Sequence, residues 1–480
     1  MMLSSSTLFL LLFISFLATV IRADDISPGS TLFASNPGQS WNSPGNNFSL
    51  SFIQESQNTY FAAVVYNGIP IWKAGGEAGG AVNSSASLRF LPNGNLQLVV
   101  GSIGLTGSIV WQSNTAGLGI TSASLEDSGN FILKNGSFPV WTTFDNPTDT
   151  ILPGQNFTID HVLQCGLYFF RLLPSGEISL RWNDSVVYYT SRGFNNTDNI
   201  NFTSPILGMQ SVGILSVFDP LLSSPVIMAR VNDYGEVSDN TLRFVKLDCD
   251  GNVRIYSSAI SNGRGNKIAR WTAVSDQCLV FGYCGNFGVC KYEEFNATPV
   301  CGCPSQDFDL IDQKNPRKGC RRKEDIQNCP TTVLSLDNSF FLTFPPDINS
   351  DLFTASITAC MSNCAADQTC VASTSLADGS GVCYMKRSGF ISGYHSPTLT
   401  STSYVKVCKP GNPNPQVPSS KASKNSEALK ITVVILGSSL VLIVLASGFL
   451  WFFSRSKPSE TLGRSRTSFT SAYDNASRDW

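Results

Sequence analysis

The residues of this chain with the clearest chemistry are its cysteines. The chain has 14 of them, all between Cys165 and Cys408, and only two histidines. An even number of cysteines confined to one region predicts disulfides formed in an oxidising compartment. A zinc site would have to use Cys301-x-Cys303 or Cys360-x3-Cys364. With two histidines and no paired Cys-x2-Cys motif, disulfides are the better interpretation.

Catalytic chemistry has little support in the sequence. His161 and His395 fall in regions that we expect to form different domains, and neither sits in a recognisable nucleophile motif. No carboxylate pair for glycoside hydrolysis stands out. Residues 454–480 contain no kinase motif and are too few for a kinase fold. We therefore expect no enzyme, no metal and no cofactor.

Charge and glycosylation motifs point to an exterior surface. Lys and Arg number 33 against 35 Asp and Glu, which argues against a nucleic-acid partner. Asn-x-Ser/Thr triplets without proline predict N-glycosylation of an extracellular chain. Between residues 24 and 430 they begin at Asn47, Asn83, Asn135, Asn156, Asn183, Asn195, Asn201 and Asn296.

Two apolar segments predict the topology. The first, Leu8 to Val20, is too short to span a bilayer and ends near Ala23, so residues 1–23 are read as a signal peptide rather than an uncleaved anchor. The second, residues 431–453, has no charge and predicts a transmembrane helix. Residues 409–430 then form a stalk and residues 454–480 a cytoplasmic tail. The two segments together predict a single-pass type I protein of the plasma membrane, with its N-terminal side extracellular.

A hairpin signature recurs along the first half of the chain. Four segments place a polar residue and a glycine between apolar alternations, with the glycines at Gly94, Gly129, Gly176 and Gly251. Glycine supplies the positive φ of a tight turn, and alternation of period two marks a strand with one buried face. The pattern predicts a short-stranded β-prism or barrel, or two related domains of that kind.

The composition of the sequence changes after Trp271, where cysteines become closely spaced. Such a segment cannot bury enough apolar surface by itself, so cross-links must compensate. Further along, Ile357, Cys360, Met361 and Cys364 follow helical spacing and predict a helix stapled to a small sheet.

Two segments carry a family resemblance. Residues 140–154, VWTTFDNPTDTILPG, and residues 168–182, YFFRLLPSGEISLRW, resemble the plant G-type (bulb-type) lectin or S-domain receptor-like family, and within it kinase-less proteins with a PAN domain. The resemblance implies a multidomain, mainly β chain. Its parts would be a bulb-lectin-like β-prism at 24–160, an S-locus glycoprotein β domain at 161–273, an EGF-like module at 274–322 and a PAN/apple domain at 329–408, followed by the transmembrane helix.

The resemblance also implies disulfide pairs that spacing alone leaves open. The EGF-like module would contain Cys278–Cys290, Cys284–Cys301 and Cys303–Cys320, and the PAN domain Cys329–Cys408, Cys360–Cys383 and Cys364–Cys370. Cys165 and Cys249 remain, and we expect them to bridge two strands of the S-locus domain.

A mannose site of the family would resemble Q-x-D-x-N-x-V-x-Y. This chain keeps only the asparagine of the motif, as Asn95 and Asn130; Asn93 stands at the position of the Asp, and the Gln and Tyr are missing. Losing several hydrogen bonds of about 1 kcal/mol each would remove most of the affinity of a monosaccharide site. We therefore expect Asn95 and Asn130 to serve the fold rather than a sugar.

Two functions remain open at this point. The chain is a receptor-like surface glycoprotein that binds a glycan, peptide or protein ligand and acts through a receptor-kinase partner, or through a homodimer, formed by the EGF-like and PAN modules. The alternative is an adhesive glycoprotein that holds wall polysaccharide without signalling.

Overall fold

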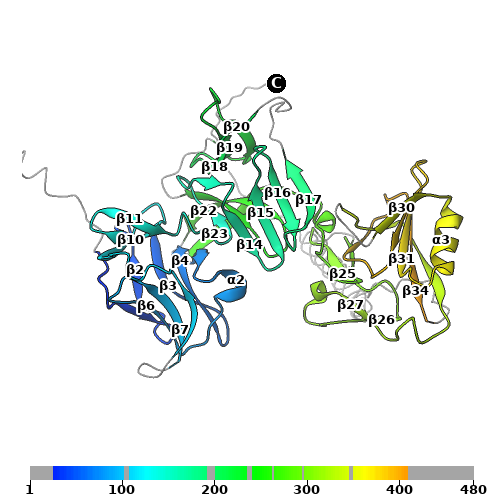
Figure 1. The fold of residues 1–480 in the computed structure, drawn as a ribbon, viewed down its shortest axis with the longest axis horizontal. Coiled ribbons are helices and arrows are strands. Elements are labelled where there is room, and N and C mark those ends of the chain that lie inside the picture. Colours follow the sequence, from blue (N-terminus) through cyan, green and yellow to red (C-terminus); the bar gives the residue numbers. More distant parts are fainter. Residues whose placement is uncertain are drawn as a thin grey trace, which may run out of the picture. The chain divides into compact units, whose positions relative to one another are not determined.

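The structure is a computed structural model that describes residues 25–101, 107–191, 201–234, 241–261, 264–293, 297–344 and 350–408. Short antiparallel strands dominate these ranges, together with a single-turn helix α2 (Gly76–Gly79) and a longer helix α3 (Ile357–Ala366) (Figure 1). No helix within them is long and apolar enough to cross a bilayer. The predicted signal peptide, stalk, transmembrane helix and tail lie outside the described residues.

The first three-sheet unit comprises β1 to β11. Each sheet turns alternate side chains inward, as in β3, where Phe48, Leu50 and Phe52 are buried. Side chains from all three sheets form one core. In strand order the sheets are β1 (Thr31–Phe33), β6 (Ala86–Phe90), β7 (Leu96–Val100), β8 (Ser108–Gln112); β2 (Ser40–Asn42), β3 (Phe48–Ser56), β4 (Thr59–Tyr66), β5 (Ile69–Lys73); and β11 (Phe138–Thr142), β10 (Phe131–Asn135), β9 (Ser122–Leu125).

The second three-sheet unit, β12 to β23, repeats this plan. Its core also contains Val274, Cys278 and Val280 of the following segment, while its Phe244 and Tyr256 pack in the core of the first unit. Its sheets are β12 (Thr150–Ile151), β21 (Thr241–Leu247), β22 (Val253–Ser261), β23 (Arg264–Thr272); β13 (Phe157–Thr158), β18 (Ile206–Met209), β19 (Ile214–Phe218), β20 (Val226–Arg230); and β14 (Val162–Cys165), β15 (Tyr168–Leu172), β16 (Ile178–Trp182), β17 (Val186–Ser191). Strands β12 and β13 precede the expected boundary at residue 160, yet pair with β21 and β18. The boundary between the first and second three-sheet units therefore lies nearer to Thr142 than to residue 160.

The four expected glycine turns are all present as hairpin turns. Gly94, Gly129, Gly176 and Gly251 have φ of 86°, 84°, 75° and 84°. At Gly251 a Cβ atom would come within 2.4 Å of the Tyr168 ring, so the turn excludes a side chain as well. A fifth turn of the same kind, at Gly213 with φ 96°, joins β18 and β19. The sequence reading missed it because no polar residue precedes this glycine directly.

The cysteine-rich unit, residues 274–408, ends the described chain. It contains two 3-10 turns, η1 (Gln277–Leu279) and η2 (Pro316–Lys318). Its sheets are β25 (Val300–Gly302), β24 (Val289–Lys291), β33 (Gly393–His395), β29 (Ser339–Phe341); β26 (Phe308–Leu310), β27 (Cys320–Arg322); and β28 (Thr332–Asp337), β34 (Ser401–Val407), β31 (Ala372–Leu376), β32 (Val382–Lys386), β30 (Ser350–Thr354).

One of these sheets joins the two modules that the resemblance separates. β24 lies in segment 274–322 and pairs in parallel with β33, which lies in segment 329–408. Phe287 of the first segment and Phe390 of the second meet edge to face, with ring centroids 5.4 Å apart. Residues 274–408 are therefore one folded unit with a shared core.

Disulfides hold the small elements in place. The structure joins Cys278–Cys290, Cys284–Cys301, Cys303–Cys320, Cys329–Cys408, Cys360–Cys383 and Cys364–Cys370, the six pairs that the resemblance implied. It also joins Cys165 and Cys249, the two cysteines that remained; Cys165 ends β14, but Cys249 lies in the turn between β21 and β22 and not in a strand as expected. Helix α3 shows why they matter. Cys360 and Cys364 are buried, whereas Ile357 and Met361 are exposed. The helix is thus held by its two disulfides more than by an apolar face.

Candidate functional site

Asn95, the asparagine at the candidate mannose-motif position, forms hydrogen bonds within the fold. Its side chain is 4% exposed and lies in the turn between β6 and β7. Its Oδ1 accepts hydrogen bonds from Ser113 Oγ at 3.0 Å and from the Thr115 amide at 3.1 Å. Its Nδ2 donates to Gln112 Oε1 at 3.0 Å. These partners occupy the groups that a sugar hydroxyl would need.

Asn130 makes the equivalent contacts in the turn between β9 and β10. Its Oδ1 accepts from Thr143 Oγ1 and from the Phe144 amide, both at 3.2 Å. Asn93 is exposed, and its Oδ1 accepts from the Asn95 amide at 3.1 Å. The structure thus leaves Asn130 and Asn93 in two different turns and does not bring them together into one site.

Three tryptophans converge instead, one from each sheet of the first three-sheet unit. Trp72 lies on β5, Trp111 on β8 and Trp141 on β11. Their ring centroids lie 5.5, 6.0 and 5.9 Å apart, and all three pairs meet edge to face. Trp72 is buried, while Trp111 and Trp141 keep part of their surface open. The cluster offers aromatic surface at an end of three outer strands.

A cleft of about 320 Å³ lies against this cluster. Besides the tryptophans, its wall contains the glycines before α2, the segment after β8 and the segment after β11. The lining residues are Trp72, Gly75, Gly76, Trp111, Gln112, Ser113, Asn114, Trp141, Asn146, Pro147 and Thr148. None of them carries a charge. The cleft is therefore suited to a neutral ligand with both apolar and hydrogen-bonding groups.

Several polar atoms of the wall remain available. Gln112 uses Oε1 to accept from Asn95 and Gln97, and its Nε2 has no partner among the described residues. Asn146 donates through Nδ2 to the Thr142 carbonyl, which leaves its Oδ1 without a partner in the same ranges. Thr148 Oγ1 has no hydrogen-bond partner among the described residues, but it is buried and therefore closed to a ligand in this structure. The amide groups of Gln112 and Asn146 could bind ligand hydroxyls.

A second cleft of about 220 Å³ shares Gly75, Gly76, Pro147 and Thr148 with the first and continues past α2. Glu77 of α2 forms an ion pair with Lys73, whose ammonium lies 4.1 Å from the centre of the Phe61 ring. Because Lys73 neutralises Glu77, the only carboxylate of this wall adds little net charge.

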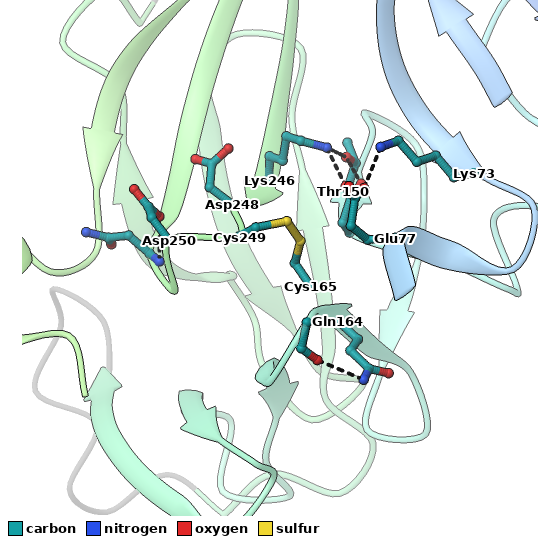
Figure 2. Close-up of a disulfide and its surroundings, with 12 residues drawn as sticks. Lys73, Glu77, Thr150, Gln164, Cys165, Lys246, Asp248, Cys249 and Asp250 are labelled. Carbon is teal, nitrogen blue, oxygen red and sulfur yellow. Dashed lines mark hydrogen bonds and ion pairs between the residues drawn. A yellow bond between two sulfur atoms is a disulfide. The ribbon is translucent and has the colours of Figure 1, made fainter. Parts of the chain in front are cut away.

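Figure 2 shows the Cys165–Cys249 disulfide beside Glu77. The Glu77 carboxylate and the two sulfur atoms lie within 4.8 Å of one another, which is a spacing that metal ligands could have. Thiolates are needed for metal binding, and these sulfurs are bonded to each other. The group therefore does not provide a metal site.

The two histidines make local contacts. His161 Nδ1 accepts from the Thr158 amide at 3.0 Å, and its ring packs on Phe157. His395 Nδ1 lies 3.1 Å from Ser339 Oγ, in the cysteine-rich unit. Both histidines pair with neighbours inside their own units, as expected for structural residues.

The sequence holds a signal for the tryptophan cluster, which the motifs considered above do not include. The strands read IPIWK, SIVWQ and FPVWT, with tryptophan as the fourth of five residues each time. When each of three similar sheets carries the same residue type at the same strand position, these residues are expected to lie close together where the sheets converge. Comparing the three strands with one another would have predicted the cluster.

Comparison with known proteins shows what this chain is similar to. Residues 70–170 match the model of the D-mannose binding lectin family. A G-type lectin S-receptor-like serine/threonine-protein kinase of Arabidopsis thaliana is 44% identical over 90% of this chain and 51% of its own length. EP1-like glycoprotein 4 of the same plant is 29% identical over 53% of this chain and 63% of its own length. A monomeric mannose-binding lectin of Gastrodia elata has 22% identity, covering 27% of this chain and 98% of that chain, with a TM-score of 0.20.

Together these findings define a mainly β, disulfide-rich chain with a bulb-lectin-like fold. Over about nine tenths of its length, the chain is similar to G-type lectin S-receptor-like kinases. The chain spans about half the length of the G-type relatives it matches.

Proposed function

We propose that this protein is a receptor-like glycoprotein of the plasma membrane that binds a neutral glycan in the tryptophan-lined cleft. The cleft itself is the observation that supports this function. Sugars present apolar C–H faces, which stack on aromatic rings, and hydroxyls, which pair with amides. Trp111 and Trp141 supply the first kind of surface, and Gln112 and Asn146 supply the second.

The same proposal assigns the partner contact to the cysteine-rich unit. Its two segments correspond to the EGF-like and PAN modules expected at 274–322 and 329–408, and they share the sheet of β24 and β33. A single rigid unit presents a larger continuous surface than two separate modules would. We propose that this surface contacts a partner receptor that carries the signal inward.

Glycan binding is tested with the full glycosylated chain and a panel of neutral oligosaccharides. Trp111→Ala should weaken binding about tenfold or more, because it removes a stacking surface. Asn114→Gly is the second variant. It removes an exposed amide of the wall and tolerates the left-handed backbone at this position, where φ is 59°. Asn93→Ala, outside the cleft, is the matched control.

The result decides between sites as well as functions. If Trp111→Ala and Asn114→Gly bind normally while Asn93→Ala does not, the glycan site is at the turn of β6 and β7 and the cleft proposal is wrong. Partner capture then compares the full chain with the full-length variants Ile311→Ser and Ile357→Ser, which change exposed apolar residues of the cysteine-rich unit. A deletion is avoided, because Val274 and Cys278 belong to the core of the second three-sheet unit and β33 pairs with β24. Recovery of wall polysaccharide without any receptor would favour the adhesive alternative.

A further inference from the structure

An exposed aromatic ring lies at the tip of the hairpin of β10 and β11. Phe138 is 74% exposed, more than any other large apolar side chain in the described ranges. Val140, on the same strand, is 40% exposed. β11 is the outer strand of the three-stranded sheet, whereas the other two sheets of this unit have four strands. A bare apolar edge of this kind favours association with other chains.

Directly across the hairpin from Phe138 stands a glycosylation motif. Asn135 pairs with Phe138 in the strand register, and Gly136 and Ser137 form the turn between them. Asn135, Gly136 and Ser137 are also the three residues of the motif. Residues opposite each other in an antiparallel pair project from the same face, with Cβ atoms about 5 Å apart. A glycan on Asn135 would therefore begin beside the Phe138 ring.

The Asn135 amide is free to carry that glycan. The residue is exposed, and its Nδ2 makes one long hydrogen bond, to the Leu118 carbonyl at 3.5 Å. Glycosylation replaces one amide hydrogen by a bond to C1 of the first sugar, with the lipid diphosphate of the donor as leaving group. The second amide hydrogen stays and can keep the contact with Leu118.

We propose that the N-glycan of Asn135 lies on the Phe138 ring and covers the apolar edge of β11. The C–H face of the first sugar is apolar and slightly positive, and it matches the negative face of the ring. Pro139 follows Phe138 and cannot donate a hydrogen bond from its backbone, so the sequence already discourages pairing at this edge. The glycan completes that protection. This inference does not depend on ligand binding in the cleft.

The test measures how fast a peptide-N-glycosidase releases each glycan from the native full chain. Mass spectrometry of the glycopeptides gives occupancy and release at Asn135 and, in the same molecules, at Asn83. Asn83 is an exposed asparagine in another loop and serves as the internal reference. Phe138→Ala should speed release at Asn135 about threefold or more and leave Asn83 unchanged, because the covering ring is gone. Phe138→Tyr keeps a ring and should release as slowly as the parent chain.

Three results would overturn the proposal. The first is an unoccupied Asn135. The second is a Phe138→Ala variant whose release is unchanged at Asn135 or faster at both positions. The third is a glycosylated chain that self-associates through Phe138, seen as a sedimentation change with Phe138→Ala. Loss of the glycan gives a further check, since Asn135→Gln should increase binding of a hydrophobic dye and adding Phe138→Ala should reverse that increase.

Discussion

The side-chain oxygen of Asn95 accepts a hydrogen bond from the backbone amide of Thr115 at 3.1 Å. The relationship recurs between Asn130 and Phe144, at 3.2 Å, and in the second three-sheet unit Asn252 accepts from the Val274 amide at 3.0 Å. Each asparagine follows the glycine of a hairpin turn and fastens the segment that comes after the neighbouring outer strand. The asparagine at the candidate mannose-motif position therefore has a structural role that recurs in the fold: its side chain holds the following segment in place.

Asn95→Ala should therefore destabilise the first three-sheet unit. The change leaves Thr115 and Ser113 without their acceptor inside a buried turn, and we expect a loss of about 2–3 kcal/mol in the free energy of unfolding. Urea unfolding followed by tryptophan fluorescence measures the loss, since Trp111 lies two residues from Ser113. Asn93→Ala, on an exposed side chain of the same turn, should change the free energy by less than about 0.5 kcal/mol. Equal stability of the two variants would contradict the fastening role.

The Cys165–Cys249 disulfide should contribute more to stability than the short disulfide of α3. Its cysteines are separated by 84 positions, against 6 for Cys364–Cys370. The entropy of loop closure in the unfolded chain grows with this separation, which gives about 4.5 kcal/mol for the first pair and about 2 kcal/mol for the second. Double serine variants of each pair, compared by chemical unfolding, should differ by about 2 kcal/mol. The reverse order would show that native contacts, not loop closure, dominate.

Tyr394 and Asp276 should give the cysteine-rich unit a dependence on alkaline pH. The Tyr394 hydroxyl donates to Asp276 Oδ2 at 2.6 Å and connects β33 to the start of η1. Burial, and then this hydrogen bond, raise the pKa of Tyr394 to about 12 from its ordinary value of 10.0. Below pH 10 both folded and unfolded chains are protonated, so the contribution is complete. Between pH 10 and 12 the unfolded chain loses its proton first, and the stability falls.

Tyr394→Phe tests this contact. At pH 7 it should cost about 1.5–2 kcal/mol, since a hydrogen bond to a charged group is lost, and it should reduce the fall in stability near pH 11, to which other buried tyrosines such as Tyr283 also contribute. Absorbance at the phenolate band gives the titration, and chemical unfolding at each pH gives the stability. Tyr234→Phe, on an exposed ring, is the control. A variant that retains the full alkaline dependence would assign it to other tyrosines.

The planar guanidinium of Arg322 connects segments 274–322 and 329–408 of the cysteine-rich unit. The group lies 5.0 Å from the centre of the Phe287 ring and 4.8 Å from that of Phe308, and it donates to the Lys406 carbonyl. Arg322→Lys keeps a positive charge but loses the planar contact, so we expect a loss of about 1–2 kcal/mol in the free energy of unfolding. Arg321→Lys, on an exposed neighbour, should have no measurable effect. Thermal unfolding of both variants compares them.

The local structure could be derived from the sequence because short-range rules fix it. Each glycine turn needs only a positive φ between two alternating strands, and Gly94 and Gly251 satisfy that requirement. The described asparagines of the glycosylation motifs, such as Asn83 and Asn183, are exposed, as polar turn residues in a low-charge chain should be. The disulfide pairs followed from the family pattern, since spacing alone allows many connectivities.

Only the tertiary structure decided what these elements do together. The sequence alone does not tell whether Asn95 binds a sugar or a backbone amide. In the structure its Oδ1 accepts a hydrogen bond from the Thr115 amide. Trp72, Trp111 and Trp141 are distant in sequence, and three converging sheets bring them to one cleft. The pairing of β24 with β33 likewise joins segments that motifs had separated. Hydrophobic alternation specifies which face of a strand is buried, but not which strand lies next to it, because that choice depends on contacts over the whole chain.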